Sequence, residues 1–239
     1  MTTDDTTRII TSNGLPTHPV GTFPNAGNPN RIYAQSYTFE VPITPSVGVA
    51  TPLERGASFG VAVNGVPFDP NAAEFWQGDP RAGWSYNALG GAVSLGLDAN
   101  YAHVQASGAY HYHGLPIGLL QQLGWSATAP SPLVGYAADG FPIYALTAQQ
   151  GERTVRMSSS YQLKSGNRPG GAQPSGRYDG AFVEDFEYIA GSGALDECNG
   201  AMITSAEYPG GTYAYFLTEA YPVIPRCLVG EAGKGFSKR

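Results

Sequence analysis

Glycine and proline punctuate this chain so often that they favour short elements joined by many turns. The 239 residues include 32 glycines and 19 prolines, and only 13% of the residues are charged. Lys, Glu and Arg, which favour helices, are scarce, whereas Tyr, Thr and Val, which favour strands, are common. We therefore expect a mainly β fold with a few short helices, arranged as a single domain built on a twisted sheet or sandwich.

The length and the turn signals divide the chain into three parts. A chain of 239 residues fits one large domain or two small ones, and it is long enough to bury a core. Residues 1–31 carry successive turn signals such as Asn13-Gly14, which predict an irregular N-terminal arm. Residues 32–230 contain the alternating segments of a β domain, with the best short helix at residues 116–125. Residues 231–239 form a C-terminal tail.

Charge and hydropathy argue against two classes of partner. The formal net charge is −6, and no run of basic residues offers a surface for nucleic acid. No apolar stretch approaches the roughly 18 residues that a membrane-spanning helix needs. We therefore expect no nucleic-acid partner and no membrane span, and the substrate stays unknown at this stage.

Two cysteines, Cys198 and Cys227, flank a strand-rich segment near the end of the chain. A disulfide between them would close a loop of about 30 residues, and two buried thiols are the alternative. The low charge and the abundance of Gly, Pro and Tyr are typical of exported proteins, which favours the disulfide. We expect a secreted, periplasmic or extracellular protein, although residues 1–5 show neither the basic start nor the apolar core of a signal peptide.

Three of the four histidines lie close together in the chain. His111 and His113 are separated by one residue, so on a strand their side chains point to the same face and the flanking tyrosines point to the other. Ser107-Gly108 is a turn signal between His103 and His111. If strands flank this turn, the resulting hairpin places His103 across from the His-x-His pair.

Three converging imidazoles predict a mononuclear metal site. Imidazole suits zinc, copper, iron and nickel, and three protein ligands leave a position open for water or substrate. We expect one divalent transition metal ion, copper or zinc, held by His103, His111 and His113. The alternative is an aromatic strand whose histidines are satisfied by hydrogen bonds in the core or at the surface. His18 is best interpreted as a surface-loop histidine, with a fourth metal ligand as the alternative.

The end of the chain repeats the pattern of its centre. Both regions contain a Leu-Asp pair, then a glycine followed by an aromatic strand, and then a proline. The quasi-repeats fall near residues 32–146 and 178–229. Ala214 and Phe216 stand where the first copy has the His-x-His pair, so the aromatic strand serves packing in both copies and the histidines are an addition to the first.

The segment Tyr110-His111-Tyr112-His113 resembles the signature of the YHYH domain family, a set of mostly bacterial and often secreted proteins. The resemblance extends over about residues 10–230. It also takes in residues 11–18, 63–68, 102–105, 139–144 and 195–200. The family is defined by its sequence motif rather than by an activity. The resemblance therefore implies a shared site around the three histidines and Asp139, and it implies no substrate.

The site predicts a metal-dependent enzyme, either a hydrolase or an oxidoreductase. Two histidines on one strand and a third on its neighbour is also the layout of carbonic anhydrases, which is an analogy of geometry rather than of descent. Asp139 and Tyr144 are the candidate catalytic residues. Asp139 would act as a base or orient a ligand, and Tyr144 would line the pocket. A turn-forming role is the alternative for Asp139.

A non-catalytic module is the alternative function. Fifteen tyrosines and three tryptophans suit carbohydrate stacking or a matrix-binding surface, and the histidines would then be packing or acid–base groups. A metal-independent enzyme is the third class. The sequence lacks a Gly-x-Ser-x-Gly elbow and a phosphate-binding glycine loop, which are common signals of that class.

Overall fold

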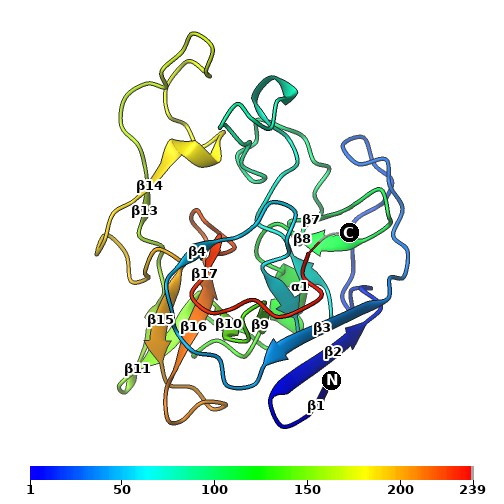
Figure 1. The fold of residues 1–239 in the computed structure, drawn as a ribbon, viewed down its shortest axis with the longest axis vertical. Coiled ribbons are helices and arrows are strands. Elements are labelled where there is room, and N and C mark those ends of the chain that lie inside the picture. Colours follow the sequence, from blue (N-terminus) through cyan, green and yellow to red (C-terminus); the bar gives the residue numbers. More distant parts are fainter. Residues whose placement is uncertain (238–239) are drawn as a thin grey trace.

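The computed structural model describes residues 1–237, and its largest element is an eight-stranded sheet. The strand order is β15-β16-β10-β9-β5-β6-β8-β7. Figure 1 labels β15, β16, β10 and β9 at one end of this order and β8 and β7 at the other. The sheet consists of β5 (Gly60–Ala62), β6 (Pro67–Phe68), β7 (Ala102–Val104), β8 (Tyr110–Tyr112), β9 (Gly135–Ala137), β10 (Pro142–Ala145), β15 (Gly200–Ile203) and β16 (Thr212–Leu217). The mainly β fold that the composition predicts is confirmed.

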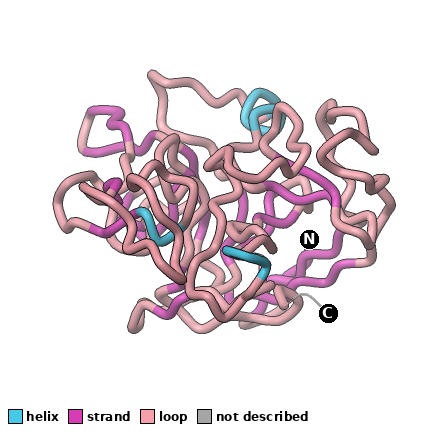
Figure 2. The backbone as a smooth tube through the Cα atoms, turned by 90° about the horizontal axis from the view of Figure 1, so that it is seen from above, coloured by secondary structure: helices cyan, strands magenta, loops and turns pink. Residues whose placement is uncertain are grey.

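Smaller sheets and short helices surround this sheet. The remaining strands are β1 (Thr2–Thr3), β2 (Thr7–Ser12), β3 (Tyr37–Pro42), β4 (Thr51–Pro52), β11 (Thr147–Gln150), β12 (Arg153–Arg156), β13 (Tyr161–Leu163), β14 (Phe186–Tyr188) and β17 (Cys227–Leu228). The α-helix is α1 (Ile117–Gln122), and the 3-10 helices are η1 (Trp76–Gly78) and η2 (Val183–Asp185). Seen from above, most of the visible backbone is loop (Figure 2). Within residues 1–237, no helix has the length and apolar character that crossing a membrane requires.

The eight-stranded sheet has a pseudo-two-fold arrangement centred between β5 and β9. These two strands pair antiparallel, with Val61 opposite Tyr136 in the middle. Moving outward on either side, the sheet repeats one plan. A hairpin strand comes first (β6 or β10), then a strand parallel to it (β8 or β16), and then an antiparallel edge strand (β7 or β15). The fold therefore contains two structural copies of one four-stranded unit.

The boundaries of these copies differ from the quasi-repeats expected near residues 32–146 and 178–229. The hairpin of β9 and β10 lies inside the first expected range, yet its register makes it the partner of the β5–β6 hairpin. The first copy is therefore β5 to β8, and the second is β9 and β10 together with β15 and β16. The second copy is hard to recognise in the sequence because a long segment separates β10 from β15.

Both ends of the described chain are tied to the body of the protein. Residues 1–31, expected to be irregular, contain β1 and β2, and β2 pairs antiparallel with β3 along its whole length. At the other end, Lys234 bridges to Glu40 on β3, and the Phe236 side chain is buried in the core. Residues 238–239 of the expected C-terminal tail lie outside the described residues.

Aromatic side chains fill the core. Tyr and Phe account for most of the largest side chains that are fully buried. Tyr110 and Tyr112 on β8 belong to the main cluster, and Tyr215 on β16 occupies it from the other copy. The core therefore uses the tyrosine side of the aromatic strand, which leaves the other side of β8 for the histidines.

Candidate metal centre

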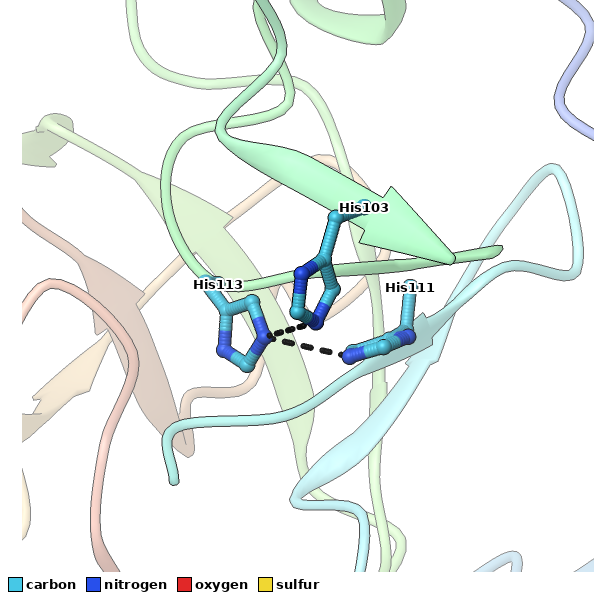
Figure 3. A group of neighbouring side chains, drawn as sticks. All are labelled: His103, His111 and His113. Carbon is cyan, nitrogen blue, oxygen red and sulfur yellow. Dashed lines mark hydrogen bonds between the residues drawn. The ribbon is translucent and has the colours of Figure 1, made fainter. Parts of the chain in front are cut away.

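The β7–β8 hairpin brings the three histidines together as their spacing predicts. His103 on β7 lies directly opposite His111 on β8. His113 follows β8, and its backbone N–H donates to the Tyr101 carbonyl at 2.7 Å, which keeps it beside the hairpin. The Nε2 atom of His113 lies 3.1 Å from the Nε2 of His111 and 3.1 Å from the Nε2 of His103 (Figure 3). His111 and His113 are buried, whereas His103 is partly exposed.

Backbone carbonyl groups set the orientation of all three rings. The Nδ1 atoms of His103, His111 and His113 lie 2.8, 3.1 and 2.8 Å from the carbonyl oxygens of Leu95, Ala109 and Asp69, respectively. A carbonyl oxygen only accepts hydrogen bonds, so these three contacts favour the tautomer in which Nδ1 carries the proton. In the neutral rings the three Nε2 lone pairs therefore point at one common place.

This arrangement fits a transition metal ion. The three histidines are a group that can hold a metal within residues 1–237, with their ligand atoms within 4.8 Å of one another. Zinc–nitrogen bonds of about 2.0–2.1 Å in a tetrahedral site require ligand nitrogens about 3.4 Å apart. The observed separations of 3.1 Å are close to that value. Backbone carbonyls behind ligating imidazoles are also the usual outer partners of metal-binding histidines.

The tyrosines beside the histidines point to the opposite side of β8 and pack in the core. The Tyr110 hydroxyl donates to the Asp98 carboxylate at 2.7 Å, and the Tyr112 hydroxyl accepts from the Asn64 side chain at 2.9 Å. Burial is the largest cause of the raised pKa of both phenols. These tyrosines therefore stay protonated and structural, which agrees with the predicted alternation of the strand.

His18 belongs to this tyrosine side, so its interpretation as a surface-loop histidine is wrong. The His18 side chain is buried, and its Nε2 lies 2.5 Å from the Tyr112 hydroxyl. Its Nδ1 lies 2.9 Å from the Pro19 carbonyl oxygen. The aromatic strand thus separates His18 from the other three histidines.

Asp69 is a functional candidate that the sequence interpretation missed. It follows β6 directly, and its side chain is only 1% exposed. Its Oδ2 lies 3.9 Å from the His111 Nε2. Its Oδ1 accepts a hydrogen bond from the Asn71 backbone N–H, and its carbonyl oxygen is the one that contacts the His113 Nδ1. Its proximity to the histidines follows from the parallel pairing of β6 with β8, which local sequence does not reveal.

Asp139 and Tyr144, the predicted catalytic residues, lie in the other copy. Tyr144 is on β10, which is separated from β8 by β9, β5 and β6; four strand spacings amount to about 19 Å. Its hydroxyl lies 2.7 Å from the Ser205 hydroxyl and donates to the Glu207 carboxylate at 2.9 Å. The proposed centre therefore does not include these two residues, and their catalytic role stays a prediction.

Asp139 occupies a buried turn between β9 and β10. Its Oδ2 accepts hydrogen bonds from the Tyr215 hydroxyl at 2.5 Å and from the Gly230 backbone N–H at 2.9 Å. Burial raises the pKa of Asp139, and these hydrogen bonds partly oppose that shift. The contacts are those of a structural carboxyl group that joins the turn to the segment after β17.

Two cavities flank the histidine centre. One of about 660 Å³ has His113 in its wall. Another of about 450 Å³ has His111 in its wall, together with Tyr37 and Gln105. A cavity therefore lies beside each of these two histidines, and the larger one is big enough for a ligand of ordinary metabolite size.

Comparison with known proteins supports the family resemblance. The family model of the YHYH protein matches residues 38–230, which is most of the chain. The chain belongs to the YHYH protein family. All three histidines of the centre and Asp69 lie inside the matched part of this YHYH protein. Neither the curated proteins nor the solved structures contain a match to it.

The predicted disulfide between Cys198 and Cys227 is confirmed. It joins the turn that precedes β15 to β17, with 29 residues of sequence separation. The bond ties the second copy of the four-stranded unit to β17, and it holds the C-terminal segment that lines the larger cavity through Arg226.

Proposed function

We propose that His103, His111 and His113 bind one divalent transition metal ion and that the protein is a metal-dependent hydrolase. The observation that carries the proposal is the convergence of three Nε2 atoms, each fixed by a backbone carbonyl behind its ring. Zinc is the proposed ion, because a nitrogen-only set of three ligands with a carboxylate nearby is typical of catalytic zinc sites.

Asp69 has a distinct part in this proposal. When bound, zinc would act as a Lewis acid that lowers the pKa of a water molecule to near neutrality. The Asp69 carboxylate, with Oδ2 at 3.9 Å from the His111 Nε2, accepts a proton beside the three imidazoles. The backbone carbonyls favour the Nδ1–H form of the rings, which leaves the Nε2 atoms to face the metal.

Copper with oxidative chemistry is the second candidate for the same centre. Imidazole binds copper as readily as zinc, and the backbone carbonyls behind these rings do not discriminate between the two metals. The carboxylate of Asp69 favours the hydrolytic alternative, because proton transfer from water needs a base and electron transfer does not. The identity of the bound metal therefore decides whether a hydrolytic or an oxidative activity is assayed.

We also propose that the protein is exported to the periplasm or outside the cell. Its two cysteines are paired in a disulfide, and disulfides persist in oxidising compartments. Membership of the YHYH family, whose members are often secreted, agrees with this location.

Hydrolysis of 4-nitrophenyl acetate by the zinc-loaded protein tests the proposed activity without knowledge of the natural substrate. We expect turnover that requires zinc and that falls at least 10-fold in Asp69→Asn, with zinc content unchanged. The matched control is Asp79→Asn, which removes an exposed carboxylate from η1's end. Zinc-loaded protein without activity above the free metal, or equal rates in Asp69→Asn, would contradict the enzyme. A non-catalytic, carbohydrate- or matrix-binding module would then take first place.

A further inference from the structure

The larger cavity is lined by a guanidinium group as well as by one histidine of the centre. Arg226 and His113 both line this cavity of about 660 Å³. Arg226 directly precedes Cys227, so the disulfide and the β4–β17 pairing hold its backbone in place. The wall of the cavity therefore presents a fixed positive charge next to the candidate metal centre.

One short segment connects the two groups. The Asp69 carbonyl oxygen is hydrogen-bonded to the His113 Nδ1. The next carbonyl oxygen in the chain, that of Pro70, accepts a hydrogen bond from Arg226 Nη1 at 2.5 Å. Arg226 Nη2 donates to the Asn71 side-chain oxygen at 2.6 Å. Consecutive Cα atoms lie about 3.8 Å apart, so the guanidinium and the imidazole are held within about 10 Å of each other. A single small molecule can span that distance.

The acidic groups that line the cavity already pair with basic side chains, whereas no ion pair among residues 1–237 gives Arg226 an acidic partner. Asp179 pairs with Arg168, and Glu219 pairs with Arg156. Arg226 bonds only to neutral oxygens, and the ion pairs among residues 1–237 do not include it. These hydrogen bonds use two of the five N–H donors of its guanidinium. The remaining donors and the unpaired charge favour an anionic ligand.

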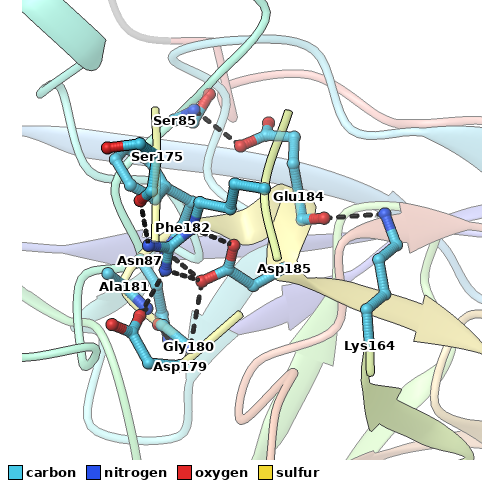
Figure 4. A network of polar contacts seen from close by, with 11 residues as sticks. Ser85, Asn87, Lys164, Ser175, Asp179, Gly180, Ala181, Phe182, Glu184 and Asp185 are labelled. Atoms are coloured by element: carbon cyan, nitrogen blue, oxygen red, sulfur yellow. Dashed lines mark hydrogen bonds and ion pairs between the residues drawn. The ribbon is translucent and has the colours of Figure 1, made fainter. Parts of the chain in front are cut away.

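Glu184, the carboxyl group that Arg226 influences electrostatically, points elsewhere. It accepts the Ser85 backbone N–H at 2.8 Å (Figure 4). Burial is the largest cause of its raised pKa, and Arg226 partly opposes that shift. The charge of Arg226 is therefore not cancelled by a direct contact with Glu184.

Aromatic side chains form another part of the cavity wall. Phe186 and Tyr221 both line it, and their rings stack with centroids 3.9 Å apart. The Arg226 guanidinium lies 6.0 Å from the centroid of the Tyr221 ring. Apolar and aromatic walls with one charged group are typical of pockets that bind the ring of a small molecule and fix its orientation through its charge.

A buried ion pair makes this wall rigid. Arg168 donates to both carboxylate oxygens of Asp185, contacts Asp179 and packs on the Phe182 ring. The Asp185 carboxylate also accepts the Gly180 backbone N–H at 3.0 Å. Asp179 and Gly180 line the cavity, so the pocket is shaped before any ligand binds.

We propose that this cavity binds a small ring-containing acid, with its carboxylate or phosphate group on Arg226 and its ring against the aromatic wall beside Phe186 and Tyr221. The remainder of the ligand then extends towards His113. The proposal deepens the proposed function because it names the substrate class of the same centre. It rests on the proposed function for the reaction, but its binding step depends on Arg226 and not on a metal.

Binding of simple probes tests this inference. Titration calorimetry of the protein as purified compares phenyl phosphate and benzoate with phenol and benzamide, their neutral counterparts. We expect both anions to bind at least 10-fold more tightly than the neutral compounds. Arg226→Gln should lower the affinity for both anions at least 10-fold. Arg81→Gln, which removes the same charge from an exposed side chain, should leave it unchanged.

The same titrations after removal of metal with a chelator separate this inference from the proposed function. Circular dichroism first checks that the chelated protein and each variant keep the fold. Anion binding that survives chelation and still depends on Arg226 supports the subsite, even if the protein takes up no metal. Anion binding that is equal in Arg226→Gln and the original protein would overturn the subsite while leaving the metal centre intact. Equal affinities for charged and neutral probes would also overturn it.

Discussion

Asp98 in the first copy of the sheet unit and Asp196 in the second organise the same turn. Each Oδ1 accepts the backbone N–H groups two and four residues later, and each Oδ2 accepts a tyrosine hydroxyl from the neighbouring aromatic strand. Tyr101 and Asn199, three residues after each aspartate, both have positive φ, at 51° and 53°. The local backbone of the two copies is therefore alike down to its unusual dihedral angles.

The two copies differ where the histidines stand. In the pairing of β15 with β16, Ala201 lies opposite Ala214, as His103 lies opposite His111. Phe216 donates its backbone N–H to Asn199, as His113 does to Tyr101. Phe216, Ala214 and Tyr144 belong to an apolar cluster there. Because the same register forms with apolar side chains, the fold does not require the imidazoles, and their convergence in the first copy is best explained by chemistry.

The largest expected effect comes from making the first copy more like the second. We expect His111→Ala, which places the residue of position 214 at position 111, to lower zinc affinity more than 100-fold, because it removes one of three ligands. Competition with a chromogenic chelator measures this affinity. His18→Gln is the matched control, because it removes the remaining histidine from the tyrosine side, and it should bind zinc as the original protein does. Unchanged affinity in His111→Ala would place the metal elsewhere.

The disulfide distinguishes the second copy from the first, in which Asn100 occupies the position of Cys198. Closing a loop of 29 residues of separation stabilises the folded state by about 3–4 kcal/mol in the chain-entropy treatment. Cys198→Ser should lower the free energy of unfolding in urea by that amount. Reductant should lower the stability of the original protein but not that of Cys198→Ser. Equal stability of the original protein with and without reductant would remove this role.

A smaller effect is expected at the turn that each copy uses to hold its second tyrosine. Asp139 accepts from the Tyr215 hydroxyl, whereas Asn64 donates to the Tyr112 hydroxyl. Asp139→Asn turns an acceptor of the Gly230 N–H into a donor in a fully buried site, so it should cost about 2–3 kcal/mol of stability. Asn64→Asp, in a partly exposed site, should cost about 1 kcal/mol.

The same Asp139→Asn variant tests the predicted catalytic role of Asp139. A structural carboxyl group lowers the unfolding free energy when replaced, and leaves the turnover of the remaining folded enzyme within about 2-fold. A catalytic base would instead lose most of its turnover. Esterase rates normalised to the folded fraction separate the two outcomes, and a large loss of turnover would restore Asp139 to the active site.

The strand alternation of the sequence was enough to predict the three-histidine group. Side chains two residues apart on a strand share a face, and a short hairpin makes the pairing local, so His103, His111 and His113 needed no long-range information. The disulfide was similarly constrained, because the chain offers only Cys198 and Cys227. The role of Asp69 needed the parallel pairing of β6 with β8, which joins residues more than 40 positions apart.

Long-range pairing also explains the differences in the fold. The strand β2 mixes Thr, Arg and Ser with two isoleucines, so its local pattern is weak, and it is defined by its register with β3. The sequence analysis predicts that Tyr144 lines the pocket of the metal site. The position of β10 between β16 and β9 takes it away from the histidines. The alternation of residues along a strand predicts which face a side chain points to, but only the order of strands in the sheet decides which residues it contacts.

Metal content tests the central claim most directly: the first copy holds a metal centre that the second copy lacks. Elemental mass spectrometry would compare untagged original protein with the triple variant His103→Ala, His111→Ala, His113→Phe, which copies the second half. We expect one equivalent of zinc or copper in the original protein and none in the folded variant. A transition metal retained by the variant, or none bound by the original protein even after reconstitution, would contradict the account.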